Sequence, residues 1–141
     1  MLRPTLHLVI LMLVALTRAA AAEDLVVVVH PDNPVTEVSR SFLREAFLKK
    51  STQWSRGERI RPIDLARKYS VRDRFTREVV KKTPAQLKSY WSQQIFSGKG
   101  VPPPEADTTS SVIAYVLANK GAVGYLPRDA DLRGAKVVRV K

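Results

Sequence analysis

The sequence predicts an α/β fold, with a mixed sheet of about four to five strands flanked by about four helices. Short apolar runs rich in Val, typical of strands, alternate with segments whose apolar residues recur at helical spacing. Clusters of Gly, Pro, Asn and Asp separate these segments and predict turns. No internal repeat or linker interrupts the pattern, so residues 23–141 are expected to form a single domain.

The first strand is expected at residues 25–29, because an unbroken run of Leu and Val is typical of a strand covered on both faces. Turn residues at positions 30–34 end this strand. Ser39 can then cap a helix, since its hydroxyl can accept a hydrogen bond from the first helical turn. The apolar residues that recur along this helix are Phe42, Leu43, Ala46 and Phe47.

The second strand is expected at residues 60–65, after a loop or short hairpin at residues 51–59. Pro62 cannot donate a hydrogen bond to a neighbouring strand, so we expect it at a sheet edge or a strand crossing. The order strand, helix, strand predicts a right-handed crossover between the first two strands.

Two further helices follow. Ser70 precedes an apolar stripe made of Val71, Phe75, Val79 and Val80. Thr83 and Pro84 predict the next helix start, with Thr83 as the cap and Pro84 at the first helical position. The side expected to be buried consists of Leu87, Tyr90, Trp91 and Ile95.

The C-terminal part completes the sheet. A stretch rich in Gly and Pro at residues 97–104 cannot continue a helix and predicts a loop. Thr108 or Thr109 begins the last helix. The elements after it are expected in this order: helix to residue 119, strand at 122–126, turn at 127–129 and strand at 136–140.

The N-terminus has the features of a secretory signal peptide. Arg3 supplies a positive charge, residues 6–16 form an apolar run, and the alanines at 20–22 fit a cleavage site. This run is shorter than the roughly 20 apolar residues that a membrane-spanning helix needs. We therefore expect residues 1–22 to be removed and the mature chain to be periplasmic, with no membrane span after cleavage.

The mature chain is strongly basic. Removing residues 1–22 takes away Arg3 and Arg18 and no acidic residue, which leaves 22 basic residues against 13 acidic ones, a net charge of +9. Such a charge favours anionic partners. Trp54, Tyr90 and Trp91 lie among cations and could stack on bases, but helical spacing favours the core for the last two, and no nucleic acid is expected as a partner.

Catalytic signatures are missing from the sequence. There is no Cys, only one His follows residue 22, and no nucleotide-binding loop or zinc-type ligand cluster occurs. We therefore expect a binding protein that is not an enzyme and that carries no cofactor or metal.

The first candidate anion site is the helix start at Ser70. Backbone N–H groups and the helix dipole favour an oxyanion there, and Arg67, Lys68 and Arg72 flank it. Arginine would add paired hydrogen bonds to the anion. Alternatively, Ser70 is an ordinary helix cap and these cations form a solvated face.

Two other places could contribute to anion binding. Thr108 and Thr109 begin a helix and could act in the same way, if folding brings them to the same sheet edge as Ser70. His30 and Asn33 follow the first strand, at the end where ligands of open α/β sheets commonly bind. A lone His is also common in turns, which is the alternative for His30.

The chain resembles one lobe of the phosphate-type periplasmic solute-binding proteins, the receptors of ABC importers. Five segments carry the resemblance: the Val-rich strand with Asn33-Pro34, then Phe47 to Trp54, Ser70 to Phe75, Tyr90-Trp91 with Phe96-Ser97-Gly98, and Gly121-Ala122-Val123-Gly124-Tyr125. The resemblance implies a single lobe of a type II periplasmic-binding-protein-like fold that binds phosphate or a similar small oxyanion. It also implies an ABC transporter permease as a partner and a link to phosphate uptake.

The chain departs from that family in two respects. Transport-type members have two lobes, whereas the mature chain is about half that length and resembles small single-lobe relatives, so a homodimer could complete the cleft. Residues 66–72 lack the glycine of the family's phosphate loop. The alternative is therefore a protein-interaction module of the cell envelope that keeps the fold without binding a ligand.

Overall fold

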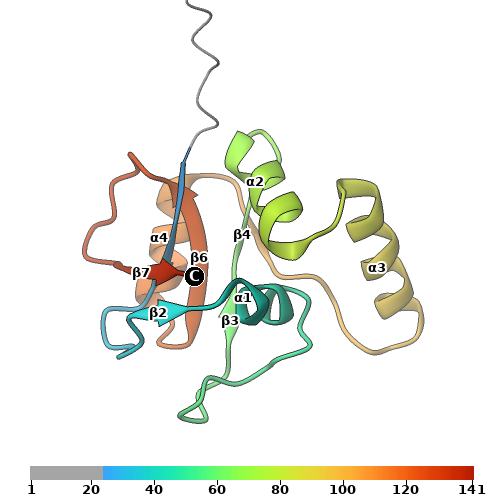
Figure 1. Ribbon diagram of the computed structural model, residues 1–141, viewed down its shortest axis with the longest axis horizontal. Helices are drawn as coiled ribbons and strands as arrows, with labels where there is room; N and C mark the ends of the chain where they lie inside the picture. The colour runs from blue at the N-terminus through green and yellow to red at the C-terminus, as the bar shows by residue number, and fades with distance from the viewer. Residues whose placement is uncertain (1–23) are drawn as a thin grey trace, which may run out of the picture.

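A five-stranded mixed sheet forms the centre of the computed structural model, which describes residues 24–141 (Figure 1). Its strand order is β2-β7-β1-β6-β3. The strands are β1 (Leu25–Val29), β2 (Glu37–Val38), β3 (Arg61–Pro62), β6 (Ala122–Pro127) and β7 (Lys136–Val140). β1 is antiparallel to both β6 and β7, whereas β2 and β3 are parallel to their neighbours. The signal peptide expected at residues 1–22 lies outside the described residues.

The second predicted strand, at residues 60–65, divides between two sheets. β3 joins the edge of the central sheet, and β4 (Asp64–Leu65) pairs in parallel with β5 (Glu105–Ala106). Pro62 therefore lies on an edge strand at a crossing, as predicted. The predicted right-handed crossover is wrong, because β6 separates β1 from β3 and the two strands run in opposite directions.

Helices lie on both faces of the sheet. They are α1 (Arg40–Phe47), α2 (Ser70–Phe75), α3 (Pro84–Phe96) and α4 (Thr109–Ala118), and the π-helical turn η1 (Thr76–Val80) continues α2 directly. The predicted caps Ser39, Thr83 and Thr108 are confirmed. Their hydrogen bonds run from Phe42 N to Ser39 Oγ (3.0 Å), from Gln86 N to Thr83 Oγ1 (3.2 Å) and from Ser111 N to Thr108 Oγ1 (3.1 Å).

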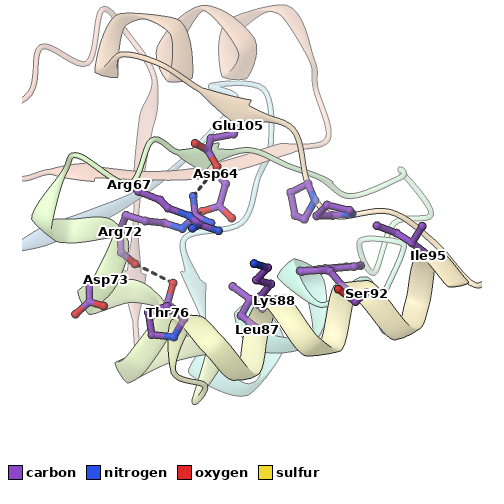
Figure 2. A pocket seen from close by; sticks show the side chains of 14 residues that line it. Asp64, Arg67, Arg72, Asp73, Thr76, Leu87, Lys88, Ser92, Ile95 and Glu105 are labelled. Carbon is purple, nitrogen blue, oxygen red and sulfur yellow. Dashed lines mark hydrogen bonds and ion pairs between the residues drawn. The ribbon is translucent and has the colours of Figure 1, made fainter.

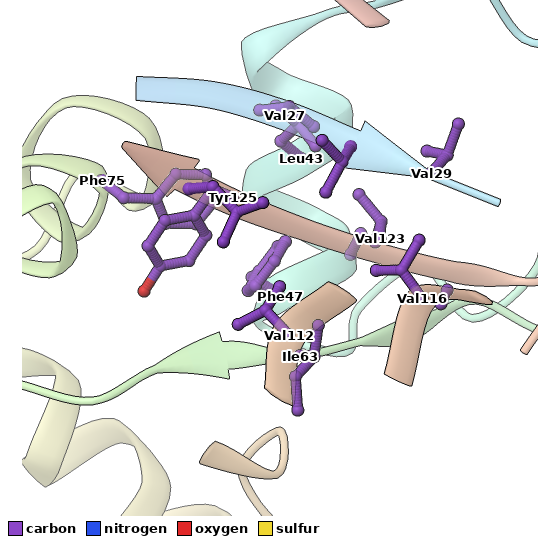
Figure 3. Packing of buried hydrophobic residues seen from close by; sticks show 14 of the residues in the cluster. Val27, Val29, Leu43, Phe47, Ile63, Phe75, Val112, Val116, Val123 and Tyr125 are labelled. Carbon is purple, nitrogen blue, oxygen red and sulfur yellow. The ribbon is translucent and has the colours of Figure 1, made fainter. Parts of the chain in front are cut away.

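The core fills both sides of β6. A side chain added at Gly124 would lie 2.9 Å from Val112 Cγ1, so this face of the strand is in close contact with α4. The neighbouring Tyr125 faces the other way and stacks on Phe75, with ring centroids 4.0 Å apart (Figure 3). Phe47 of α1 packs edge-on against Phe75 at 4.7 Å. The predicted stripe of the helix after Ser70 is buried throughout.

Helix α3 packs against this core with only part of its length. Figure 1 shows it at the opposite side of the molecule from β7, beyond α2. Of the four residues predicted to be buried, Trp91 is buried, Leu87 and Tyr90 are half-buried, and Ile95 is 54% exposed. The prediction is wrong for Ile95, which lies one turn beyond the buried Trp91, next to the last residue of the helix. No helix among residues 24–141 is both long and apolar enough to cross a bilayer.

Candidate functional site

Two helix starts lie at one edge of the structure because β4 and β5 are parallel neighbours. Ala66 N, just after β4, donates to Ala106 O at the end of β5 (2.9 Å). Soon after these strands α2 begins at Ser70 and α4 begins at Thr109. The condition under which Thr108 and Thr109 could act together with Ser70 is therefore met.

The structure places His30 and Asn33 at the opposite edge. Val29, the last residue of β1, pairs with Val123 near the beginning of β6. The strand that leads to Ser70 runs the other way, towards the end of β6, where Leu65 N donates to the Tyr125 hydroxyl (3.3 Å). His30 and Asn33 thus share no site with Ser70.

His30 and Asn33 have local partners in the turn after β1. His30 Nδ1 accepts a hydrogen bond from Asp32 N (3.0 Å), and Asn33 Oδ1 accepts one from Val35 N (3.1 Å). Asn33 is buried, and its Nδ2 has no hydrogen-bond partner among the described residues. These bonds stabilise the turn.

A cleft of about 470 Å³ lies beside the common edge, between β4–α2 and α3 (Figure 2). Its polar wall includes Asp64, Arg67, Arg72, Asp73, Thr76 and Glu105. Its other wall includes Leu87, Lys88, Trp91 and Ile95 of α3, together with Pro102 and Pro103. A concave site with one apolar wall and a few polar groups is typical of ligand sites. Of the predicted anion-binding residues, Arg67 and Arg72 line this cleft.

Arg72 is already neutralised by the protein. Its guanidinium donates to Leu65 O (2.7 Å) and Glu105 Oε2 (3.1 Å), and its Nε lies 3.4 Å from Asp64 Oδ1. Burial opposes the charge of Arg72, but the neighbouring Asp64, Tyr125 and Glu105 together raise its pKa above the usual value. Arg72 therefore holds the polar wall together, with little charge left for an added anion.

Asp64 is the carboxylate at the centre of this network. The Tyr125 hydroxyl donates to Asp64 Oδ1, and the side chain of Asp64 is only 13% exposed. Burial raises the pKa of Asp64, although Arg72 and the Tyr125 hydrogen bond act in the opposite direction. Burial and the Asp64 charge likewise raise the pKa of Tyr125. The network fixes the end of β4, from which the chain enters α2.

Arg67 and Lys88 are the cations of the cleft that remain available. Figure 2 shows Arg67 reaching in from the β4–α2 side and Lys88 from α3. Within residues 24–141, neither side chain has an acidic residue within ion-pair distance. Lys68 is exposed, with Nζ 5.4 Å from the centre of the Tyr69 ring. Two cations from different elements facing one space can bind an anion.

The helix starts differ in detail from the sequence interpretation. Tyr69, not Ser70, occupies the cap position of α2 and gives it no side-chain cap, and Ser70 is the first helical residue. Thr108 does cap α4, as predicted. In the part of the chain that the structure describes, no three His, Asp or Glu side chains come together as a metal site.

Sequence reasoning missed three functional groups of the cleft. Asp64 and Glu105 were not assigned as the partners of Arg72, and Lys88 was not assigned to the cleft. A signal for Lys88 was present, because it directly follows Leu87 and lies one helical turn before Trp91, both predicted to face inward. No comparable signal indicated which carboxylates pair with Arg72.

Comparison with solved structures identifies similar folds. A Clostridium perfringens protein, described as a phosphate ABC transporter substrate-binding protein with bound phosphate, matches at 20% identity with a TM-score of 0.64, over 82% of this chain and 44% of its own. An ABC-type phosphate transport receptor from Vibrio cholerae matches at 19% identity with a TM-score of 0.62, over 82% of this chain and 45% of its own. PstS from Borrelia burgdorferi matches at 12% identity with a TM-score of 0.63, over 83% of this chain and 47% of its own.

These neighbours define the fold. The chain spans less than half the length of each of the three proteins. No protein-family model matches the sequence, and no curated protein matches it either. The two neighbours from Clostridium and Vibrio are described as transport proteins, not enzymes. The prediction from sequence is confirmed: the chain has the fold of a single lobe of a phosphate-type solute-binding protein.

Proposed function

We propose that this domain is an extracytoplasmic solute-binding module that binds phosphate or a similar small oxyanion in the cleft beside α2. Arg67 and Lys88 would bind the anion from opposite walls. The backbone at Ser70 and Thr109, with the Thr108 hydroxyl and Lys68 nearby, would supply further donors at the adjoining edge. Arg72 would act indirectly, by fixing the end of β4 through Asp64 and Glu105.

The observation that carries this proposal is the position of Arg67 and Lys88. Both enter one cleft, and no acidic side chain among residues 24–141 neutralises either of them. The fold supports the proposal, because a neighbouring structure with the same lobe contains bound phosphate. The cleft opens to solvent on a chain that spans less than half of such proteins, so we expect weak affinity. A second copy could cover the open side.

The setting that we propose for this activity is the periplasm, after removal of residues 1–22. The fold neighbours from Clostridium perfringens and Vibrio cholerae are described as parts of ABC-type phosphate transport. We propose an ABC transporter permease or another envelope protein as the macromolecular partner. The basic charge of the chain favours a partner with acidic surface groups.

Phosphate titration of residues 23–141 tests the proposal. Thermal unfolding and calorimetry should show a saturable, phosphate-dependent stabilisation at constant ionic strength. The double variant Arg67→Gln, Lys88→Gln should lose it. Arg61→Gln, Lys120→Gln is the matched control, because both side chains are exposed and remote from the cleft. No heat at millimolar phosphate, or equal loss in the control, would refute the proposed site.

The alternative is a protein-interaction module that keeps the fold without binding a ligand. The ion pairs of Arg72 favour this alternative, because the most buried cation of the cleft is already paired with Asp64 and Glu105. An unfolding transition unchanged by phosphate, together with recovery of one envelope protein in a pull-down, would support this second function.

A further inference from the structure

The end of α3 carries most of the exposed large apolar side chains. Four such residues are found among residues 24–141, and three belong to one short segment: Ile95 is 54% exposed, Phe96 97% and Val101 60%. The fourth, Val137, lies on β7 at the other side of the molecule (Figure 1). We call residues 95–101 the α3 tip. Exposed apolar clusters of this kind mark interaction sites.

A fixed turn holds these side chains outward. Gly98, with φ of 70°, ends α3, and its N–H donates to Ile95 O (3.1 Å). Lys99 N donates to Gln94 O (2.9 Å). These two bonds form a Schellman motif, which orders the turn after the helix. Phe96 is therefore the last residue of an ordered helix, and its side chain is exposed to solvent.

The sequence around the α3 tip contains no acidic residue. Between Glu78 and Glu105 lie 26 residues, all of α3 among them, with four lysines and no Asp or Glu. The lysines are Lys81, Lys82, Lys88 and Lys99. Within the described part of the chain, none of them forms an ion pair. The segment is therefore apolar at its tip and positively charged along its length.

These properties select among the partners that could cover the tip. A second copy docked tip to tip would bring two Lys99 side chains together with no acidic residue in either tip, so repulsion opposes it. A protein groove would have to enclose a side chain that projects almost completely into solvent. An anionic bilayer offers both an apolar layer for Phe96 and phosphate groups for the lysines, without needing a shaped pocket.

We propose that the α3 tip binds the surface of an anionic phospholipid bilayer, with Phe96, Ile95 and Val101 inserted between head groups and Lys99 beside lipid phosphates. One short apolar tip gives reversible, peripheral attachment. The contact is distinct from the oxyanion site, because Phe96, Lys99 and Val101 do not line the cleft and Ile95 lies only at its wall.

Co-sedimentation of residues 23–141 with vesicles tests the proposal. We expect binding to phosphatidylcholine vesicles that contain phosphatidylglycerol, and little binding to phosphatidylcholine alone. Phe96→Ser with Val101→Ser should weaken binding about ten-fold or more, because the apolar transfer is lost. Val137→Ser is the matched control and should bind like the wild type, since it removes an exposed apolar side chain far from the tip.

The contribution of charge to binding is tested with Lys99→Gln. The control is Lys120→Gln, which changes an exposed lysine just after α4. Lys99→Gln should weaken binding more than Lys120→Gln. The proposal would be overturned if the wild type and the Phe96→Ser, Val101→Ser variant bound vesicles equally well. It would also be overturned if Val137→Ser weakened vesicle binding as much as that variant does, or if free phosphate released all of the protein from the vesicles. Capture of an acidic protein with no vesicle binding would also overturn it. Circular dichroism of each variant confirms that the fold is retained.

Discussion

At the scale of single residues, Asp64 couples the buried network to pH. It accepts a hydrogen bond from the Tyr125 hydroxyl and lies beside Arg72, where water hardly reaches it. Such a group is costly to ionise without compensation, and here compensation comes from one cation that also serves Glu105. The protonation of Asp64 should therefore register in the stability of the whole domain.

We predict a pH-dependent difference between the wild type and Asp64→Asn. Burial raises the pKa of Asp64 above its ordinary value of 3.8, so the folded protein holds this proton more tightly than the unfolded chain. The resulting stability is fully present below pH 3.8 and is lost as pH rises through the raised pKa. The melting temperature of the wild type relative to Asp64→Asn should fall across that window. Parallel pH profiles for the two proteins would contradict the assignment.

A second residue-scale prediction concerns Gly121. A Cβ at this position would lie 1.9 Å from Arg59 O, and Gly121 O accepts hydrogen bonds from both Arg61 N and Trp54 Nε1 at 2.9 Å. Gly121→Ala must separate these backbones and should cost about 3 kcal/mol of unfolding free energy in a denaturant titration. Gly100→Ala is the control, because nothing lies within 4 Å of its added Cβ. A cost below that of the control would exclude the close approach.

At the scale of elements, α1 and α3 end in the same turn with different residues. In α1 the bonds run from Lys49 N to Ala46 O (3.1 Å) and from Lys50 N to Glu45 O (2.8 Å), which repeats the pattern at the end of α3. Lys49 takes a φ of 57° where α3 has Gly98 at 70°. A side chain in this left-handed conformation is strained, and glycine is not.

Replacing Lys49 by glycine and Gly98 by alanine should change the free energy of unfolding in opposite directions. Lys49→Gly should raise the free energy of unfolding by about 0.5–1 kcal/mol, because it relieves the strained backbone. It also removes an ammonium group whose pKa is lowered by burial and by Arg59. Gly98→Ala should lower the free energy of unfolding by about 1 kcal/mol, since open space leaves only the conformational cost. Denaturant midpoints measure both; a stabilising Gly98→Ala would contradict the turn geometry.

Elements with strong local signals could be predicted from the sequence. Neighbouring residues alone indicate the structure of three kinds of feature. These are the Val-rich run of β1, the caps at Ser39, Thr83 and Thr108, and the apolar stripe after Ser70. The strands β2 and β5 could not be predicted. Each has two residues and exists because a partner remote in the sequence pairs with it, such as Arg139 opposite Glu37.

The candidate site was predictable only in part. The common edge of the Ser70 and Thr109 helix starts follows from a parallel pair, β4 and β5, whose second member has no local signature. The sequence indicated that Arg72 was near this edge but not that Asp64 and Glu105 neutralise it, because side-chain pairing depends on the folded neighbours. The direction of β1 was likewise undetermined, since an apolar strand is equally well buried either way.

At the scale of the whole molecule, the excess of positive charge should oppose folding. Residues 23–141 carry 22 basic and 13 acidic residues, and most ion pairs in the described part include at least one exposed side chain. Such pairs contribute little, so the unpaired cations dominate the field.

We therefore predict that sodium chloride stabilises the domain. As the Debye length falls from about 30 Å at 0.01 M to about 10 Å at 0.1 M, self-repulsion should weaken and the melting temperature should rise by a few degrees. Calorimetry of residues 23–141 measures this, and potassium fluoride at equal ionic strength should give the same rise. A fall in melting temperature would show that the exposed ion pairs outweigh the repulsion.

The place of β1 has a consequence for biogenesis. Both neighbours of this N-terminal strand, β6 and β7, come from the far end of the chain, with Leu25 opposite Pro127 and Val27 opposite Val138. A chain that emerges from a ribosome or a translocation pore amino end first must keep β1 unpaired until its partners in β6 and β7 have been delivered. Long-range pairing of this kind slows folding. Until β7 arrives, the Val-rich segment is a natural target for holdase chaperones.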